Sequence, residues 1–365
     1  MRAQPLADRS TAMLPPRPVL VPALLGAVLS TTLLRGHAQD LPAQVRTGGA
    51  GSLERFNVGG VGGWDFLTFD SSGQRLFIAR GDRVQVWSAM EKKVVAEIAG
   101  TPGVHGVALA HDLNRGFSSN GRANTVGVFA LDDLKITQTL EVGDNPDAIL
   151  YEPTLKRIYA FNGRSRSVSV IDAVGLSVLA TLPLGGKPEV AVADGAGHVF
   201  VNIEDTAELV VIDQTGNRIQ ARWPLKPCLE PTGLAIDVAH RRLFSVCGNN
   251  KMVIVDADSG RVVAEAPIGD GPDGAEFDPA TRKAFSANGQ GTVTVVQETD
   301  AEHFATVATI PTQAGARTLA LDPASHRIYL VTASFGQAPA SSSSGTRPRP
   351  PMLKDSFTVL VLPPQ

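Results

Sequence analysis

The chain has 365 residues, a formal net charge of −3, and 36 Gly and 25 Pro that are frequent at turns rather than gathered in one tract. This length admits several ordinary domains or one closed all-β array. Basic residues do not outnumber acidic ones, as they do in proteins that bind nucleic acid non-specifically. The sequence also lacks a C-x-x-C-H haem motif, a G-x-S-x-G elbow and a phosphate-loop pattern, which removes the usual signatures of three enzyme and carrier classes.

Residues 1–38 have the pattern of a signal peptide. Arg2, Arg9 and Arg17 precede an apolar run from Val19 to Leu34, and small residues follow at 36 and 38. The run is too short and too polar for a membrane span. We therefore predict export to the periplasm or the exterior, a flexible leader over residues 39–52, and no transmembrane span in the mature chain.

A unit of about forty residues then repeats along the chain. Residues 146–186, PDAILYEPTLKRIYAFNGRSRSVSVIDAVGLSVLATLPLGG, contain four short stretches of alternating apolar residues separated by turn residues, which predict four β-strands. Equivalent positions at the start of each first strand are 40 to 44 residues apart, which is the period of a propeller blade. These positions are Asp65, His105, Asp147, Glu189, Thr232, Asp273 and Arg317. The pattern predicts an all-β fold, a seven-bladed β-propeller of four-stranded antiparallel blades.

Residues 146–186 and the unit PTGLAIDVAHRRLFSVCGNNKMVIVDADSGRVVAEAPIG also resemble the YVTN repeat of YncE-like seven-bladed propellers. The resemblance covers about residues 52–362. It implies a secreted or periplasmic propeller, and it carries no catalytic signature.

The two ends of the repeat region indicate how the ring closes. LERFNV at residues 53–58 resembles the fourth strands of later units, while the last unit supplies three strands. We expect the N-terminal strand to complete the last blade, so that the propeller spans residues 53–365 and has no free edge. Residues 333–354 are a Ser/Pro-rich loop insertion in the last blade, which is either a tolerated surface loop or a lid over the axial mouth.

Strand direction predicts which side chains share one mouth of the propeller. The first strand of each blade lines the axis, so its entrance residue and the end of the second strand lie on one face. The expected ligand-binding funnel consists of Asp65, His105, Asp147, Glu189, Thr232, Asp273 and Arg317, with Arg80, Asn120, Asn162 and Asn288 behind them.

Two interpretations fit this funnel. Entrance positions are polar simply because they are hydrated, and Asp after Pro is a common turn residue. Alternatively, Asp65, Asp147, Glu189 and Asp273 hold Ca²⁺ or Mg²⁺, since hard ions prefer oxygen ligands. The fold resembles calcium-dependent lactonase propellers, which also have an axial carboxylate cluster. His105 is then the candidate base and Arg317 the candidate oxyanion holder.

Cys228 enters the fifth unit and Cys247 ends its second strand, so both lie at the predicted mouth. In an oxidising compartment we expect them to form a disulfide; two buried thiols are the alternative.

The resulting functional prediction is a monomeric exported binding module. Its funnel and rim loops face a small polar ligand or an envelope or extracellular protein. A metal-assisted hydrolase, lactonase or lyase is the alternative. Nucleic acid is a weaker third choice, in which Arg164, Arg166, Arg241 and Arg242 bind single strands.

Overall fold

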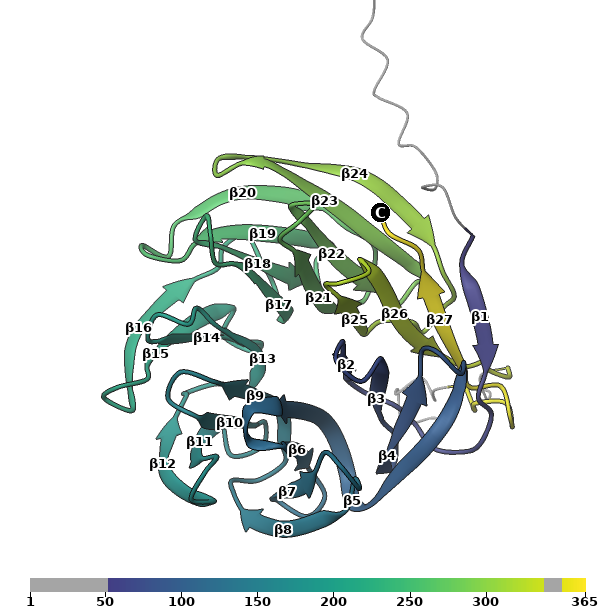
Figure 1. The fold of residues 1–365 in the computed structure, drawn as a ribbon. Coiled ribbons are helices and arrows are strands. Elements are labelled where there is room, and N and C mark those ends of the chain that lie inside the picture. The colour runs from purple at the N-terminus through teal and green to yellow at the C-terminus, as the bar shows by residue number, and fades with distance from the viewer. Residues whose placement is uncertain (1–51, 338–349) are drawn as a thin grey trace, which may run out of the picture. The chain divides into compact units, whose positions relative to one another are not determined.

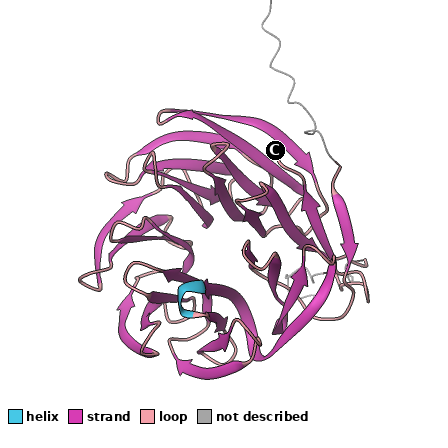
Figure 2. Cartoon of the chain, in the orientation of Figure 1, coloured by secondary structure: helices cyan, strands magenta, loops and turns pink. Residues whose placement is uncertain are grey.

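The computed structural model describes residues 52–337 and 350–365, so the predicted signal peptide and nearly all of the leader lie outside the described residues. The described residues form antiparallel sheets that stand around a central axis (Figure 1). Strands make up almost all of their regular structure, and a single 3-10 turn, η1 (His111–Leu113), interrupts them (Figure 2). The predicted all-β propeller is confirmed. No helix in the described part of the chain is long and apolar enough to cross a membrane.

Five sheets have four strands each. The first contains β9 (Pro146–Glu152), β10 (Arg157–Asn162), β11 (Ser167–Asp172) and β12 (Ser177–Pro183). The second contains β13 (Pro188–Ala193), β14 (His198–Ile203), β15 (Glu208–Asp213) and β16 (Arg218–Pro224). The third contains β17 (Pro231–Asp237), β18 (Arg242–Cys247), β19 (Lys251–Asp256) and β20 (Val262–Pro267). The fourth contains β21 (Pro272–Asp278), β22 (Lys283–Asn288), β23 (Thr292–Asp300) and β24 (His303–Pro311).

The fifth four-stranded sheet joins the two ends of the described chain. It contains β25 (Leu319–Asp322), β26 (Arg327–Thr332), β27 (Thr358–Leu362) and, as its outer strand, β1 (Glu54–Asn57). β1 pairs antiparallel with β27, from Glu54 opposite Val361 to Asn57 opposite Thr358. The N-terminal strand therefore completes the last sheet, as the sequence predicts.

The remaining strands form one sheet of seven, which corrects the expectation of seven separate four-stranded blades. It contains β2 (Leu67–Asp70), β3 (Arg75–Ala79), β4 (Gly81–Ser88), β5 (Lys93–Ala110), β6 (Arg115–Asn120), β7 (Thr125–Ala130) and β8 (Ile136–Glu141). The cause is β5, an 18-residue strand that pairs with β4 along its first half and with β6 along its second half. Residues 100–103, which contain Pro102, continue this strand instead of ending it, so the structure has five four-stranded sheets and not seven.

Burial explains the hydrophobic pattern of each repeat. The second and third strands are covered on both faces by neighbouring sheets, so β10 and β18 are buried almost throughout. The outer strands alternate instead, and β16 is half-buried and exposed at every second residue because one of its faces meets solvent. The aromatic residues at one register of the second strands are all buried in these inter-sheet layers: Phe77, Phe117, Tyr159, Phe200, Phe244, Phe285 and Tyr329.

The inner strands surround the axis. β9, β13, β17, β21, β25 and β2 contact one another in this order, and β5 lies between β2 and β9. Small side chains permit this approach: a Cβ on Gly233 would lie 2.6 Å from the backbone nitrogen of Ala275 on the next inner strand. Hydroxyl groups tie the same layer, because Thr232 donates to the carbonyl of Pro272 at 3.0 Å and Thr318 to that of Asp65 at 3.0 Å.

Candidate functional site

The entrance residues of the inner strands meet at one mouth of the axial channel. Proline begins β9, β13, β17 and β21, a strand position where its missing N–H costs nothing. The pairing register shifts immediately afterwards, as between Pro231 and Leu234, and such bulges re-aim side chains. At this mouth lies a pocket of about 280 Å³, which we call the funnel pocket. It is lined by Asp65, Phe66, Asp147, Lys187, Glu189, Glu204, Thr232, Asp273 and Arg317.

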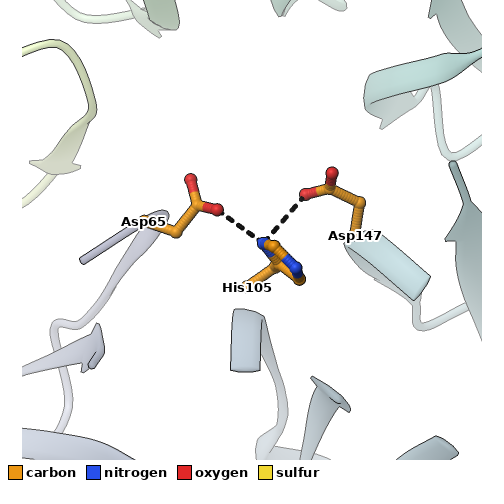
Figure 3. A group of neighbouring side chains, drawn as sticks. All are labelled: Asp65, His105 and Asp147. Carbon is orange, nitrogen blue, oxygen red and sulfur yellow. Dashed lines mark hydrogen bonds and ion pairs between the residues drawn. The ribbon is translucent and has the colours of Figure 1, made fainter. Parts of the chain in front are cut away.

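His105 lies between two of the carboxylates in this mouth (Figure 3). Its Nδ1 is 2.6 Å from Asp65 Oδ2 and 3.6 Å from Asp147 Oδ1. Burial lowers the pKa of His105, but the hydrogen bond to Asp65 and the charge of Asp147 outweigh this effect and raise it. The raised pKa favours the protonated imidazole, which donates a hydrogen bond to Asp65.

The other two predicted metal-binding carboxylates already have cations. Lys187 Nζ lies 2.6 Å from Glu189 Oε1 and also bonds to Glu204, while Arg317 Nε lies 2.9 Å from Asp273 Oδ2. The structure thus brings Asp65 and Asp147 together with His105, and it places Glu189 and Asp273 in separate ion pairs. The Nε atom of Arg317, the predicted oxyanion holder, is paired with Asp273.

The funnel pocket has more negative than positive groups. Burial raises the pKa of Asp147 to about 6, with a further contribution from Asp65 that His105 opposes. Burial likewise raises the pKa of Asp273 to about 6 against the opposing charge of Arg317. Burial and the charge of Asp147 raise the pKa of Glu189 despite its bond to Lys187. Each shift reflects a carboxylate that is incompletely compensated, so an added cation would stabilise this pocket.

The residues expected behind the funnel do not line it. Arg80 is fully buried, donates to the carbonyls of Val61 and Gly62, and lies 3.6 Å from the centre of the Phe357 ring. The three asparagines are also buried and bond mainly to hydroxyl groups of their own sheets: Asn120, Asn162 and Asn288. Their role in the described structure is to satisfy buried polar groups.

Sequence reasoning missed three charged residues of the channel. Lys187 directly precedes β13, and Glu204 follows β14 in a turn that strand direction places at the same mouth. Glu276 lies deeper, in β21, where it joins mostly apolar residues around a pocket of about 130 Å³. The signal for Glu276 was its charge at a position where the other inner strands carry Thr, Ala, Leu or Val.

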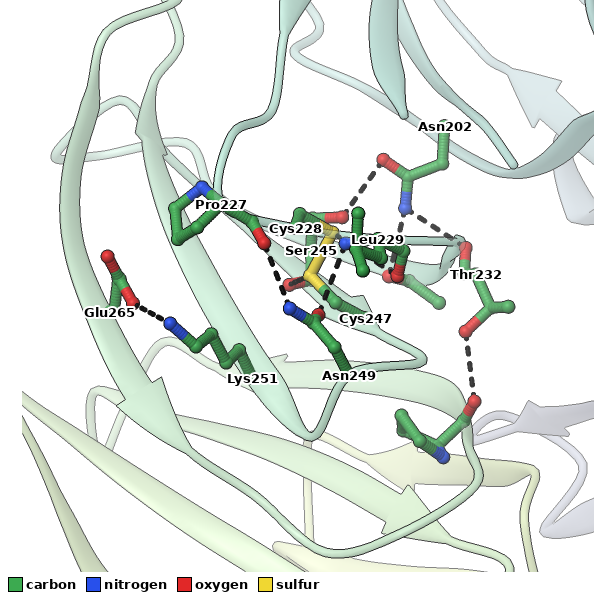
Figure 4. The surroundings of a disulfide bond; sticks show 12 residues. Asn202, Pro227, Cys228, Leu229, Thr232, Ser245, Cys247, Asn249, Lys251 and Glu265 are labelled. Atoms are coloured by element: carbon green, nitrogen blue, oxygen red, sulfur yellow. Dashed lines mark hydrogen bonds and ion pairs between the residues drawn. A yellow bond between two sulfur atoms is a disulfide. The ribbon is translucent and has the colours of Figure 1, made fainter. Parts of the chain in front are cut away.

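The two cysteines form a disulfide beside this mouth (Figure 4). Cys228 lies in the connection from β16 to β17, and Cys247 ends β18; their Cα atoms are 5.4 Å apart. Asn249 supports the same connection by accepting from the Leu229 amide at 3.1 Å and donating to the Pro227 carbonyl at 2.9 Å. Cross-linking fixes one side of the funnel wall.

Two further predicted features are only partly described. At the base of the insertion Phe335 bridges to Met352, but residues 338–349 lie outside the described residues, so neither the lid nor the surface-loop interpretation is tested. Among the proposed nucleic-acid-binding arginines, Arg166 pairs with Asp205, Arg241 with Asp194 and Arg242 with Asp256. These partners leave little positive charge to bind a phosphate backbone.

Comparison with solved structures shows the fold. No protein-family model matches the chain, and no curated protein matches it. The WD40 repeats of RRP9 superpose with a TM-score of 0.71 at 12% identity, covering 84% of this chain and 96% of that chain. A chain of Kuenenia stuttgartiensis hydrazine synthase gives 0.63 at 18% identity, covering 73% and 92%. A chain of the mitotic checkpoint complex gives 0.66 at 13% identity, covering 84% and 96%.

The protein is thus a β-propeller with a polar pocket at one axial mouth. The neighbours establish the architecture alone, because all three are below 20% identical to this chain. The finer YVTN-repeat, YncE-like assignment is not confirmed.

Proposed function

We propose that this protein is an exported binding module whose funnel pocket holds a small polar ligand through a positively charged group. The observation that carries the proposal is the charge balance of the pocket. Five carboxylates line it, from Asp65, Asp147, Glu189, Glu204 and Asp273, against the two permanent cations Lys187 and Arg317. Asp65 and Asp147 share the single imidazole of His105, so an ammonium group beside them would supply further positive charge.

The adjoining pocket extends the recognition surface. It measures about 450 Å³, shares Asp65 and His105 with the acidic cluster, and adds Trp64, Arg122 and Arg164. A ligand that reaches both pockets would place its cationic group on the carboxylates and its neutral or anionic part near the two arginines. This combination favours a small zwitterionic or amine-bearing molecule.

A protein partner could supply the same chemistry through a Lys or Arg side chain inserted into the funnel. One structural neighbour is a chain of a multi-protein assembly, the mitotic checkpoint complex. Export, and hence an envelope or extracellular partner, is supported by the Arg-rich apolar N-terminus and by the disulfide. N-terminal sequencing of protein recovered from the periplasm or medium would test cleavage near residue 38.

Thermal melting with paired probes tests the binding proposal. Putrescine is the cationic probe and succinate is the anionic probe of the same chain length. We expect putrescine to raise the Tm of the wild type and to lose this effect in Asp147→Asn, while Asp144→Asn, an exposed carboxylate nearby, responds normally. Equal stabilisation by succinate, or an unchanged response of Asp147→Asn, would contradict the proposal.

A second candidate function is metal-assisted hydrolysis or lyase chemistry at the same mouth. Ligand atoms of Asp65, His105 and Asp147 lie within 4.8 Å of one another, which favours it. A nitrogen beside two carboxylates suits a transition ion better than the calcium or magnesium that the four carboxylates suggested. A stoichiometric ion in chelator-free protein, lost in Asp147→Asn, would favour this second function; retention of that ion in the variant would argue against it.

A further inference from the structure

A separate cluster lies at the opposite end of the inner strands, away from the funnel pocket. Thr232 stands at the entrance of β17, whereas Asp237 is its last residue, and His240 follows in the turn to β18. Glu298 reaches the same place from β23 of the neighbouring sheet. Figure 1 shows these two sheets side by side around the ring.

The three side chains converge closely. His240 Nδ1 lies 2.5 Å from Asp237 Oδ2 and 3.2 Å from Glu298 Oε1. One ligand atom from each residue lies within 4.8 Å of the other two. Asp237 and Glu298 are 3% and 1% exposed, while the His240 side chain is 38% exposed and leaves a path from solvent.

Glu298 has His240 Nδ1 as a neighbour at 3.2 Å, but it has no hydrogen bond that would compensate its burial. Neither of its carboxylate oxygens accepts a hydrogen bond from any residue that the structure describes. A buried carboxylate without donors costs several kcal/mol, by order of magnitude, unless a proton or a cation compensates it. The unpartnered oxygens face Asp237 and His240, so the missing partner belongs between these three groups.

Equivalent places in the other sheets show that this arrangement is particular to one inter-sheet contact. The amide of Glu298 donates to the carbonyl of Arg282, and the matching amides belong to uncharged residues: Ala89, Leu131, Ala173, Gln214 and Ala257. An alanine at this position needs no partner. The fold therefore does not require a charged residue there.

At two other inner-strand ends, a basic side chain from the next sheet reaches the aspartate. Arg241 reaches Asp194 at 3.0 Å, and His326 reaches Asp278 at 2.8 Å. The corresponding Arg282 instead bonds to the carbonyl of Thr299. From the next sheet, Asp237 thus meets a second carboxylate where Asp194 and Asp278 meet a basic side chain.

We propose that Asp237, His240 and Glu298 bind a divalent transition-metal ion such as Zn²⁺ and thereby link two neighbouring sheets. One imidazole nitrogen with two carboxylate oxygens is a donor set that zinc accepts, with a fourth position open to water along the exposed edge of His240. Ligand atoms on one tetrahedral zinc ion lie roughly 3.3 Å apart, so the Asp237–His240 contact needs to open by less than about 1 Å.

Calorimetric titration of metal-stripped, full-length mature protein with Zn²⁺ tests the site. We expect Glu298→Gln to lose one zinc equivalent, or to bind it at least about 100-fold more weakly, because even outer partners of a metal site are worth 10 to 100-fold. Glu298→Ala is the second variant, and it should fold because three other sheets carry Ala at that place. Co²⁺ absorption in the visible range gives an independent signature of imidazole and carboxylate ligation.

Two controls separate this site from other ligands. His198→Ala removes an Asp–His pair that has Arg241 instead of a third acid, so it should keep the zinc. The same titration of Asp147→Asn shows whether any of the Zn²⁺ is bound at the funnel pocket. The proposal is overturned if both Glu298 variants bind as much Zn²⁺ as the wild type with the same affinity, or if the only zinc taken up by the wild type is lost in Asp147→Asn. In either case the buried pair shares a proton instead.

Discussion

Replacing Glu276 with glutamine should stabilise the protein in a pH-dependent way. Glu276 lies in the axial channel, with the backbone amide of Leu321 as its hydrogen-bonding partner among the described residues. Burial raises the pKa of this carboxyl from 4.5 to about 7, against the opposing effect of that amide. A raised carboxyl pKa means that the folded state binds the proton more tightly. The contribution of the protonated Glu276 to the free energy of unfolding is fully present below about pH 4.5. It is lost as the pH rises through about 7.

The size of the effect follows from the shift. One pKa unit corresponds to about 1.4 kcal/mol, so complete ionisation of Glu276 costs on the order of 3 kcal/mol. Part of that cost is already present at about pH 5, where the unfolded chain is mostly ionised. The advantage of Glu276→Gln over the wild type should therefore grow by about 2 kcal/mol between about pH 5 and about pH 8.

Urea unfolding of both proteins at the two pH values measures this difference. Glu141→Gln, at an exposed position, is the matched control and should show no such pH-dependent gain. A gain that is equal at both pH values would refute the reasoning, because glutamine would then differ from glutamate by packing alone. A gain that falls with pH would mean that a cation compensates Glu276 in the channel.

Two further substitutions test the ring. Replacing Cys228 and Cys247 by serine should lower the free energy of unfolding by about 3 kcal/mol, since the disulfide closes a loop with a sequence separation of 19. An unchanged urea midpoint would argue against a stabilising cross-link. Gly233→Ala should lower the free energy of unfolding by roughly 1 to 3 kcal/mol, because the added Cβ would meet the backbone of β21. Gly63→Ala is the control, since a Cβ there meets open space. Equal Tm values for these two variants would contradict the close packing of the inner strands.

The repeat was readable from the sequence because stacked sheets impose a local rule. Second and third strands are buried on both faces, so each unit needs the same apolar bursts and the same turn residues. For the same reason the outer strand LERFNV could be assigned to the last sheet from its residue pattern alone. Strand direction also placed the entrance residues at one mouth.

The division into sheets could not be predicted from the sequence. It depends on whether a short connection forms a turn or pairs with the strands beside it. Residues 100–103 contain Gly and Pro and look like a turn, yet they continue β5 and merge two repeats into one seven-stranded sheet. Local propensity does not settle such a choice when pairing to strands on both sides is available.

Charge compensation was decided by tertiary structure as well. The sequence presents Asp147, Glu189 and Asp273 as equivalent acids, but Lys187 and Arg317 form ion pairs only with the latter two. Glu298 and Asp237 are about sixty positions apart and carry no shared motif, so their contact emerges only when two sheets pack together. Periodicity thus determined the propeller, because backbone pairing and burial repeat along the chain. The partners of each buried charge depended on which strands became neighbours in space.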